Sequence, residues 1–258
     1  MKVENIIITG ASSGIGAALA IKYAQKKIRL GLIARNSIAL ERIAQQCRGL
    51  GAQVEIGVLD VCDVDRLSEW IKDFDQKYPV DMLIANAGVA NTLGNNGEPE
   101  AWDAIKMVIN TNIYGVLGSV ESLIPLMIQR QRGCLVLMSS LAAYRGLPLT
   151  PSYCASKAAV KSYGEALRGW LKVYGIQVTV VCPGFVESDM SDRFPAKKPF
   201  LMSAQRAADI IHRGVNQRKA CIAFPFPLNL GSWLLGIIPS ALADIILPWF
   251  GYGIRRKL

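Results

Sequence analysis

Histidines and close-set cysteines are scarce in this sequence. The chain of 258 residues has one histidine, His212, and six cysteines that lie far apart, with no Cys-x-x-Cys pair. Because a structural zinc ion takes Cys or His ligands at short spacings, this composition argues against a zinc site, and we expect no metal. Scattered single thiols are typical of reduced proteins, and Met1–Asn5 leads straight into an apolar strand. We therefore expect a cytoplasmic protein without a cleaved leader.

Low-complexity tracts and internal repeats are also lacking. Charged residues make up only 19% of the chain, whereas apolar residues make up 51%. This balance supplies a sizeable buried core and excludes a disordered or fibrous protein. The length fits one large α/β domain.

Acidic residues are scarce in the last quarter of the chain. Residues 193–258 hold 10 Lys/Arg against 2 Asp/Glu, whereas residues 1–192 hold 19 against 18. The net charge of +9 therefore belongs mostly to the C-terminal quarter. Because the basic surplus is confined to one end of the chain and does not extend over the whole protein, we expect no nucleic-acid partner.

Short apolar runs alternate with amphipathic helical patterns up to about residue 185. The runs, which predict strands, are 5–9, 30–34, 54–59, 81–85, 134–139 and 177–182. The helical patterns between them include 16–26, 38–49, 64–77 and 153–174. This alternation is typical of βαβ units with right-handed crossovers, and it predicts an α/β fold with a doubly wound parallel sheet in a single domain. We expect residues 1–190 to form the core and 191–258 to add a substrate-loop region and an apolar, basic C-terminal extension.

The C-terminal extension contains an uncharged stretch of 24 residues, Ala220–Ala243. That length would suit a membrane span. Pro225, Pro227 and Pro239 interrupt the stretch, and its first residues, 220–226, read as a buried strand. A membrane span is therefore the less favoured interpretation.

A glycine-rich turn follows the first predicted strand. Thr9–Gly16 reads T-G-A-S-S-G-I-G and leads directly into a helix. Glycines at such a turn let backbone N–H groups approach a pyrophosphate, which then lies at the positive end of the helix. An ordinary tight turn has the same composition, but the order of strand, turn and helix favours dinucleotide binding. After the second strand, Arg35 stands where NAD-binding proteins carry a carboxylate, so we expect NADP(H) in preference to NAD(H).

Tyr153 and Lys157 are spaced i, i+4 on one face of a predicted helix. A free Tyr has a pKa of about 10 and is a poor acid–base group at neutral pH. A nearby ammonium and the positive nicotinamide ring of an oxidised cofactor both favour the phenolate and lower that pKa. Such pairs are common on ordinary helices, but Ser139 and Ser140 end the preceding predicted strand and can bring a hydroxyl to the same pocket.

With these motifs in this order, the sequence resembles the short-chain dehydrogenase/reductase family over about residues 1–190. The matching motifs are Thr9–Gly16, Leu59–Val61, Asn86–Gly88, Asn112–Gly115, Ser140, Tyr153 with Lys157, and Pro183–Gly184. The resemblance implies a Rossmann-type fold and an oxidoreductase that moves a hydride between NADP(H) and a carbonyl/secondary alcohol pair. It also implies a homodimer or homotetramer.

The roles of the family's residues carry over position by position. The resemblance implies that Tyr153 is the general acid in reduction and the base in oxidation, while Lys157 lowers its pKa and holds the nicotinamide ribose. Ser140 would donate a hydrogen bond to the substrate oxygen, and Asn112 would hold a water that links Lys157 to solvent. The implied cofactor-binding residues are Gly10, Ser12, Ser13, Gly14, Ile15, Gly16, Arg35, Asp60, Val61, Asn86, Ala87, Gly88, Tyr153, Lys157, Pro183, Gly184, Val186 and Ser188.

Three interpretations of the apolar C-terminal extension are open. It forms core and subunit interface, or an apolar substrate entrance, or a peripheral attachment to an anionic membrane. The residues expected to line the entrance are Trp233, Leu234, Leu235 and Ile237. The residues that suit a membrane surface are Trp233, Trp249, Phe250, Tyr252, Arg255, Arg256 and Lys257. We favour the last two interpretations together and expect a hydrophobic or lipid-like substrate.

Two rival functions use the same fold. An epimerase or dehydratase would recycle its cofactor, and a non-catalytic NADP-binding scaffold or sensor would need no acid–base residues. The glycine spacing and the presence of Asn112, Ser140, Tyr153 and Lys157 favour the oxidoreductase.

Overall fold

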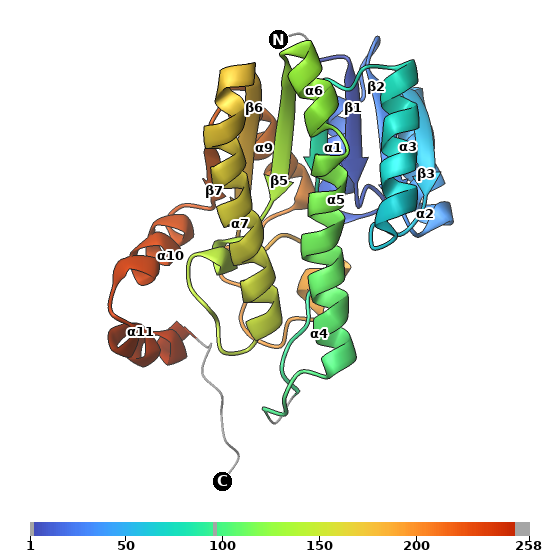
Figure 1. Ribbon diagram of the computed structural model, residues 1–258. Helices are drawn as coiled ribbons and strands as arrows, with labels where there is room; N and C mark the ends of the chain where they lie inside the picture. Colours follow the sequence, from blue (N-terminus) through green and yellow to red (C-terminus); the bar gives the residue numbers. More distant parts are fainter. Residues whose placement is uncertain (1–2, 95–96, 251–258) are drawn as a thin grey trace.

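The computed structural model describes residues 3–94 and 97–250 of the chain. Seven parallel strands form one sheet in the order β3-β2-β1-β4-β5-β6-β7 (Figure 1). The strands are β1 Asn5–Thr9, β2 Arg29–Ala34, β3 Gln53–Val58, β4 Met82–Ala85, β5 Gly133–Met138, β6 Ile176–Pro183 and β7 Cys221–Phe224. The chain winds outward from β1 to β3, returns to β4 beside β1 and then winds the other way. The sheet is therefore doubly wound, and its direction of winding reverses between β1 and β4.

Helices cover both faces of the sheet (Figure 1). The α-helices are α1 Gly14–Tyr23, α2 Ser37–Gly49, α3 Val64–Lys77, α4 Trp102–Ile109, α5 Gly115–Glu121, α6 Ile124–Arg130, α7 Pro151–Leu171, α8 Asp189–Asp192, α9 Ala204–Asn216, α10 Leu228–Ile237 and α11 Ser240–Ile246. The other helical segments are the π-helix η1 Asn110–Tyr114 and the 3₁₀ helices η2 Leu141–Ala143, η3 Lys172–Tyr174 and η4 Leu247–Phe250. One core packs α1, α2 and α9 on the sheet, and the other packs α3, α5, α6 and α7 on the opposite face.

The central strands of the sheet are largely apolar because both of their faces are covered. Ile6, Ile7 and Ile8 in β1 are all fully buried, with successive side chains in different cores. A strand buried on both sides shows no alternation of polar and apolar residues, so a continuous apolar run identifies it. The six predicted strands are confirmed to within one residue at each end, and β7 lies inside the predicted stretch 220–226.

Two apolar stretches bear on the question of a membrane span. The uncharged stretch Ala220–Ala243 folds as β7, α10 and the start of α11, so it is not one continuous helix. The continuous helical segment Trp102–Arg130, which the sequence analysis missed, is long and apolar enough to cross a membrane. However, 56% of its most apolar stretch of 18 residues is buried inside the domain, as is expected of a core helix.

A buried ion pair ties this helical segment to the sheet. The Nη1 and Nη2 atoms of Arg130 in α6 lie 2.6 and 2.8 Å from the two carboxylate oxygens of Asp75 in α3. The side chain of Asp75 is only 5% exposed, and it also accepts a hydrogen bond from the backbone N–H of Val80 before β4. One carboxylate thus connects two helices and the approach to a central strand.

We expect Asp75→Asn to lower the free energy of unfolding by about 3 kcal/mol, because the Arg130 guanidinium loses its buried carboxylate partner. Urea denaturation followed by circular dichroism measures this change. Asp73→Asn is the matched control, since Asp73 is an exposed residue on the same helix and its loss should cost less than about 0.5 kcal/mol. Equal effects of the two substitutions would contradict this account of the ion pair.

Candidate active site

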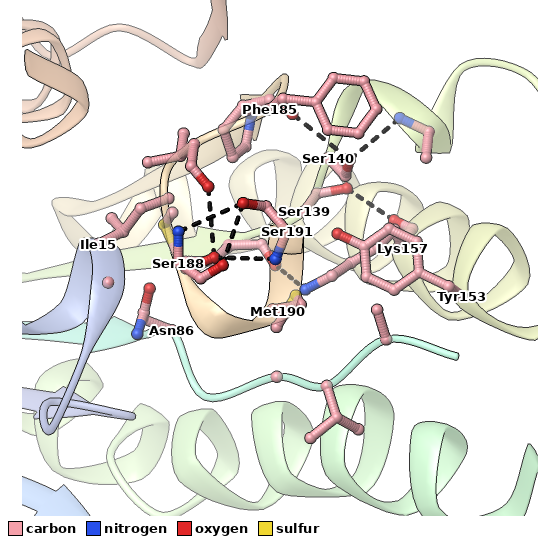
Figure 2. A pocket seen from close by; sticks show the side chains of 18 of the residues that line it. Ile15, Asn86, Ser139, Ser140, Tyr153, Lys157, Phe185, Ser188, Met190 and Ser191 are labelled. Carbon is pink, nitrogen blue, oxygen red and sulfur yellow. Dashed lines mark hydrogen bonds between the residues drawn. The ribbon is translucent and has the colours of Figure 1, made fainter. Parts of the chain in front are cut away.

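The predicted site residues meet at one edge of the sheet. Parallel strands bring their carboxyl ends together, and the ends of β1, β4, β5 and β6 surround a cavity of about 530 Å³. All of the predicted catalytic and cofactor-binding residues line this cavity except Gly16 and Asn112. Figure 2 shows Ser140, Tyr153 and Lys157 on one side and Ile15 and Asn86 on the other.

The turn between β1 and α1 requires glycine. Gly10 and Gly14 have φ angles of +67° and +53°, which side chains disfavour. A Cβ on Gly10 would lie 2.8 Å from Cα of Ala87, and a Cβ on Gly16 would overlap the carbonyl oxygen of Gly10. Gly16 therefore lies beneath the turn and supports it rather than lining the cavity.

The end of β4 is locked to the glycine turn by hydrogen bonds. The hydroxyl oxygen of Thr9 accepts the backbone N–H groups of Asn86 and Ala87, both at 3.0 Å. In return, the side-chain amide of Asn86 donates to the carbonyl oxygens of Thr9 and Gly10 at 2.9 and 3.2 Å. These bonds fix the floor of the cavity at the point where the winding of the sheet reverses.

Arg35 and Asp60 lie together at the other end of the cavity. Nη1 of Arg35 is 3.4 Å from a carboxylate oxygen of Asp60, and the arginine is exposed. Burial by itself would raise the pKa of Asp60, but hydrogen bonds from Cys62 and the charge of Arg35 outweigh it and hold that pKa below its usual value. The structure thus leaves one carboxylate and one guanidinium at the place where the sequence analysis expected adenosine recognition.

Lys157 is buried, and its charged end is held by β5. Its Nζ donates to the carbonyl oxygen of Met138 at 2.9 Å, and its own carbonyl oxygen accepts the Ser139 hydroxyl at 2.7 Å. Burial lowers the pKa of Lys157 to about 8. Helix α7 is therefore fixed to the end of β5 at the level of the predicted catalytic residues.

The groups of the protein itself raise the pKa of Tyr153. Its burial raises the pKa to about 12, and a hydrogen bond with Ser140 offsets this only in part. In the protein itself, Nζ of Lys157 donates to Met138 and lies 5.7 Å from the centre of the Tyr153 ring. The prediction that Lys157 and an oxidised nicotinamide ring together lower this pKa refers to the site with its cofactor bound, and it stays a prediction.

Asn112 lies behind the cavity in the π-helical turn η1, and it is fully buried. Its amide donates to the carbonyl oxygen of Val89 and to the Ser156 hydroxyl, both at 2.9 Å, and its oxygen accepts the N–H of Val89 at 2.8 Å. The Asn112 side chain thus fixes the position of Ser156, the residue before Lys157. Its role in holding a water molecule stays a prediction.

The loop after β6 folds over the glycine turn. Val186 forms a bridge with Met202, and Ser188 begins α8 by accepting the backbone N–H of Ser191 at 3.2 Å (Figure 2). A Cβ on Gly14 would lie 3.4 Å from Cβ of Ser188, so the loop and the turn are in contact. Pro183 and Gly184 continue from β6 into this loop and line the same cavity.

Sequence reasoning missed Glu100, which positions the start of α7. Its carboxylate accepts the backbone N–H of Ser152 at 3.0 Å and the Ser152 hydroxyl, and it also accepts the Asn91 amide at 3.1 Å. A carboxylate at a helix N-terminus is favourable, and Ser152 immediately precedes Tyr153. No motif surrounds Glu100 in the sequence, so only the folded chain reveals this contact.

The remaining wall of the cavity is mainly apolar, although Arg145, Thr150, Ser191 and Ser232 also line it. Its apolar part is formed by Leu141, Ala142, Leu147, Phe185, Met190, Phe194, Pro199, Phe200, Leu228, Leu235 and Leu247. Of the four residues predicted to line a substrate entrance, Leu235 does so. The prediction is wrong for Trp233, Leu234 and Ile237, which point to solvent because α10 turns another face toward the cavity.

The doubly wound sheet, the glycine turn and the buried Ser-Tyr-Lys group define a Rossmann-type α/β protein with a dinucleotide-type site. The sequence model of the short chain dehydrogenases matches residues 4–199. A curated relative, an uncharacterized oxidoreductase of Myxococcus xanthus, is 33% identical over 95% of this chain and 96% of its own. The chain therefore belongs to the short-chain dehydrogenase family of oxidoreductases.

Two further relatives extend over most of the chain. A protein of Arabidopsis thaliana named 11-beta-hydroxysteroid dehydrogenase-like 4A is 30% identical over 92% of this chain and 81% of its own. The solved structure of a short-chain dehydrogenase from Sphingobium yanoikuyae in complex with NADPH covers 99% of this chain and 98% of its own, with a TM-score of 0.78 and 23% identity. This last likeness shows the fold.

The buried position of Lys157 predicts a pH dependence of stability. The folded state holds the pKa near 8 and the unfolded state near 10.5, so the unfolded chain binds more protons between these values. Below about pH 8 the buried ammonium lowers the free energy of unfolding, and this loss should be recovered as the pH rises toward 10.5. We expect the difference in unfolding free energy between wild type and Lys157→Met to shift by about 3 kcal/mol in favour of wild type over this range.

Urea denaturation of both proteins at a series of pH values measures the difference, in which the titration of other groups cancels. A difference that does not change with pH would contradict the burial of a titrating ammonium.

Proposed function

We propose that the protein is an NADP(H)-dependent oxidoreductase that interconverts a carbonyl and a secondary alcohol of a hydrophobic substrate. One observation carries the proposal: a single cavity joins a polar end, built on the glycine turn, to an apolar end, with Ser140 and Tyr153 between them. Acid–base residues at the junction of a nucleotide-type site and an apolar site are what reduction of a ketone requires.

The residues at the polar end fit a nicotinamide dinucleotide. Gly10 and Gly88 let the backbone pass close to its neighbours at this end, because a Cβ on Gly10 would lie 2.8 Å from Cα of Ala87 and a Cβ on Gly88 would lie 3.3 Å from Nζ of Lys157. The turn and the start of α1 would hold the pyrophosphate, Asp60 and Val61 the adenine, and Lys157 with the segment Asn86–Gly88 the ribose next to the nicotinamide. When bound, the cofactor supplies or accepts the hydride.

The preference for NADP(H) rests on Arg35. The guanidinium is exposed, lines the cavity and follows β2, where a 2′-phosphate would lie. Its ion pair with Asp60 is long, at 3.4 Å, so the Arg35 guanidinium is held only weakly by Asp60 and could bind a phosphate. Solved structures of this fold bind either NADPH or NAD, so the preference rests on Arg35.

Tyr153 is in the state that reduction needs. With a pKa of about 12, its hydroxyl is protonated at neutral pH and can donate that proton to a substrate carbonyl oxygen. In the reverse direction the phenolate is needed, and the positive charges of Lys157 and an oxidised nicotinamide ring would both favour it. Because a pKa of about 12 also makes the phenol a weak acid, catalysis in either direction is helped when these charges lower it.

Ser140 is placed to stabilise charge on the same oxygen. Its hydroxyl oxygen accepts the N–H of Ala142 at 3.1 Å, and its proton is directed to the carbonyl oxygen of Pro183 at the long distance of 3.4 Å. Because that bond is weak, the hydroxyl can turn to a substrate oxygen at little cost as negative charge develops there.

The apolar wall sets the class of substrate. Leu141, Phe185 and Leu235 lie around the end of the cavity beyond Ser140, so a bulky hydrocarbon group finds contacts there that a small polar molecule does not. The name of the Arabidopsis relative, hydroxysteroid dehydrogenase-like, is consistent with this class. The cytoplasmic location and the homodimer or homotetramer stay predictions from the sequence.

We expect Tyr153→Phe to lower kcat at least about 1,000-fold, because a general acid contributes up to about 10⁴ in rate, while the Kd for NADPH changes less than about 2-fold. Oxidation of NADPH with a series of ketones of increasing chain length measures kcat, and fluorescence titration measures the Kd. Tyr163→Phe is the matched control on the same helix, since its hydroxyl bonds to Glu121 outside the cavity. Wild-type protein that binds NADPH but reduces no ketone would favour the sensor instead.

We expect Arg35→Ala to raise the KM for NADPH by about 10- to 100-fold and to leave the KM for NADH nearly unchanged, because it removes charge-assisted bonds to the 2′-phosphate alone. Steady-state kinetics with each cofactor provides the comparison. Arg66→Ala, at an exposed arginine outside the cavity, is the control. A KM for NADPH that stays the same in Arg35→Ala would remove the basis for NADP preference.

A further inference from the structure

Helix α10 carries apolar side chains on two opposite faces. Leu228 and Leu235, seven residues apart, line the cavity together with Gly231 and Ser232 between them. Trp233 and Ile237 lie on the other side of the helix and are 50% and 63% exposed. At 100° per residue these two groups are separated by about half a turn, so α10 is a wall between the cavity and the outside.

Helix α11 repeats this arrangement. Ala243 and Leu247 are buried, and Leu247 also lines the cavity, whereas Leu242 and Ile245 are exposed. In Figure 1 the two helices stand apart from those that cover the sheet. The exposed apolar side chains of this region, which we call the outer face, are Phe226, Leu230, Trp233, Leu234, Ile237, Leu242 and Ile245.

The charges around the outer face suit a negatively charged partner. Between Ala220 and Ile254 the only charged residue is Asp244, and the sequence then continues with Arg255, Arg256 and Lys257. These three residues, with Tyr252, lie outside the described residues, as do the side chains of Trp249 and Phe250. The C-terminal quarter as a whole carries eight more basic than acidic residues. An uncharged apolar surface that contains Trp and lies next in sequence to a basic cluster is the composition that anionic lipid surfaces attract.

We propose that the outer face lies on the surface of a lipid bilayer that contains anionic lipid. As an extension that rests on the proposed function, the cavity on the inner side of α10 then receives its hydrophobic substrate from the hydrocarbon phase. A second copy of the chain suits this face less well. In a two-fold symmetric contact the same patch meets itself, and the uncharged outer face offers no opposite charge to the basic residues that follow it in the sequence. A bilayer supplies both the apolar phase and the opposite charge.

The test is flotation of the full chain with vesicles of phosphatidylcholine alone and of phosphatidylcholine with phosphatidylserine. Wild type should float with the mixed vesicles, and Trp233→Glu/Ile237→Glu should bind them at least about 10-fold more weakly, because two large side chains no longer enter the apolar phase. Ile38→Glu/Val173→Glu is the matched control. Those side chains are 84% and 76% exposed but lie on α2 and η3, away from the outer face. This control should bind like wild type.

A second variant tests the contribution of the basic residues to vesicle binding separately from that of the apolar contacts. Arg255→Gln/Arg256→Gln/Lys257→Gln should weaken binding to the mixed vesicles and leave the weak binding to phosphatidylcholine unchanged. Wild type that stays unbound in both vesicle preparations would overturn the proposal. So would equal loss of binding in the Ile38/Val173 control, or a Trp233/Ile237 variant that only lowers the oligomeric mass in sedimentation analysis, which would assign the face to a second copy.

Activity distinguishes this proposal from the proposed function. Reduction of a water-soluble ketone should be the same in wild type and Trp233→Glu/Ile237→Glu, because neither side chain lines the cavity. Reduction of a ketone dissolved in the mixed vesicles should fall in that variant. Absence of both reductions in wild type that binds vesicles would contradict the proposed function and leave the docking surface intact.

Discussion

The attachment of Lys157 to the end of β5 is the constraint on which the rest of the site depends. Its Nζ donates to the carbonyl of Met138, and its carbonyl accepts the hydroxyl of Ser139, so side chain and backbone of one residue are both tied to the same strand. The preceding residue, Ser156, is tied to Asn112 in the π-helical turn. Because Tyr153 lies one helical turn before Lys157, these bonds determine where its hydroxyl enters the cavity.

The position of this group on the sheet follows from topology. All strands end at the same edge, and the reversal of winding between β1 and β4 leaves that edge open above the glycine turn. The bonds of Thr9 with Asn86 and Ala87 close the sheet across the reversal. β5 and β6 then bring Ser140 and Pro183 to the same edge of the sheet. The chain winds in two directions from one pair of central strands, β1 and β4. This winding brings the polar and the apolar ends of the cavity next to each other.

The fold and most of the site could be predicted from the sequence because they depend on local patterns. Doubly buried strands show as apolar runs, and Tyr153 and Lys157 show as an i, i+4 pair. Glu100 could not be predicted, because its partner Ser152 lies 52 residues away and neither forms a motif. The raised pKa of Tyr153 could not either, since it arises from burial by the whole domain. In α10 six of the ten residues are large and apolar and they lie on two opposite faces, so no single apolar periodicity in the sequence distinguishes Leu235 from Trp233.

The two faces of α10 place different demands on its residues. The inner face lines the cavity, where the proposed hydrophobic substrate would find apolar contacts. Trp233 and Ile237 are 50% and 63% exposed within the described part of the chain, so polar residues there would cost the domain little packing and would remove apolar surface from water. An apolar outer face is therefore unexplained by the needs of the domain itself. The proposed contact with a bilayer would explain it, and the same helix would then lie between that apolar phase and the cavity that Tyr153 lines.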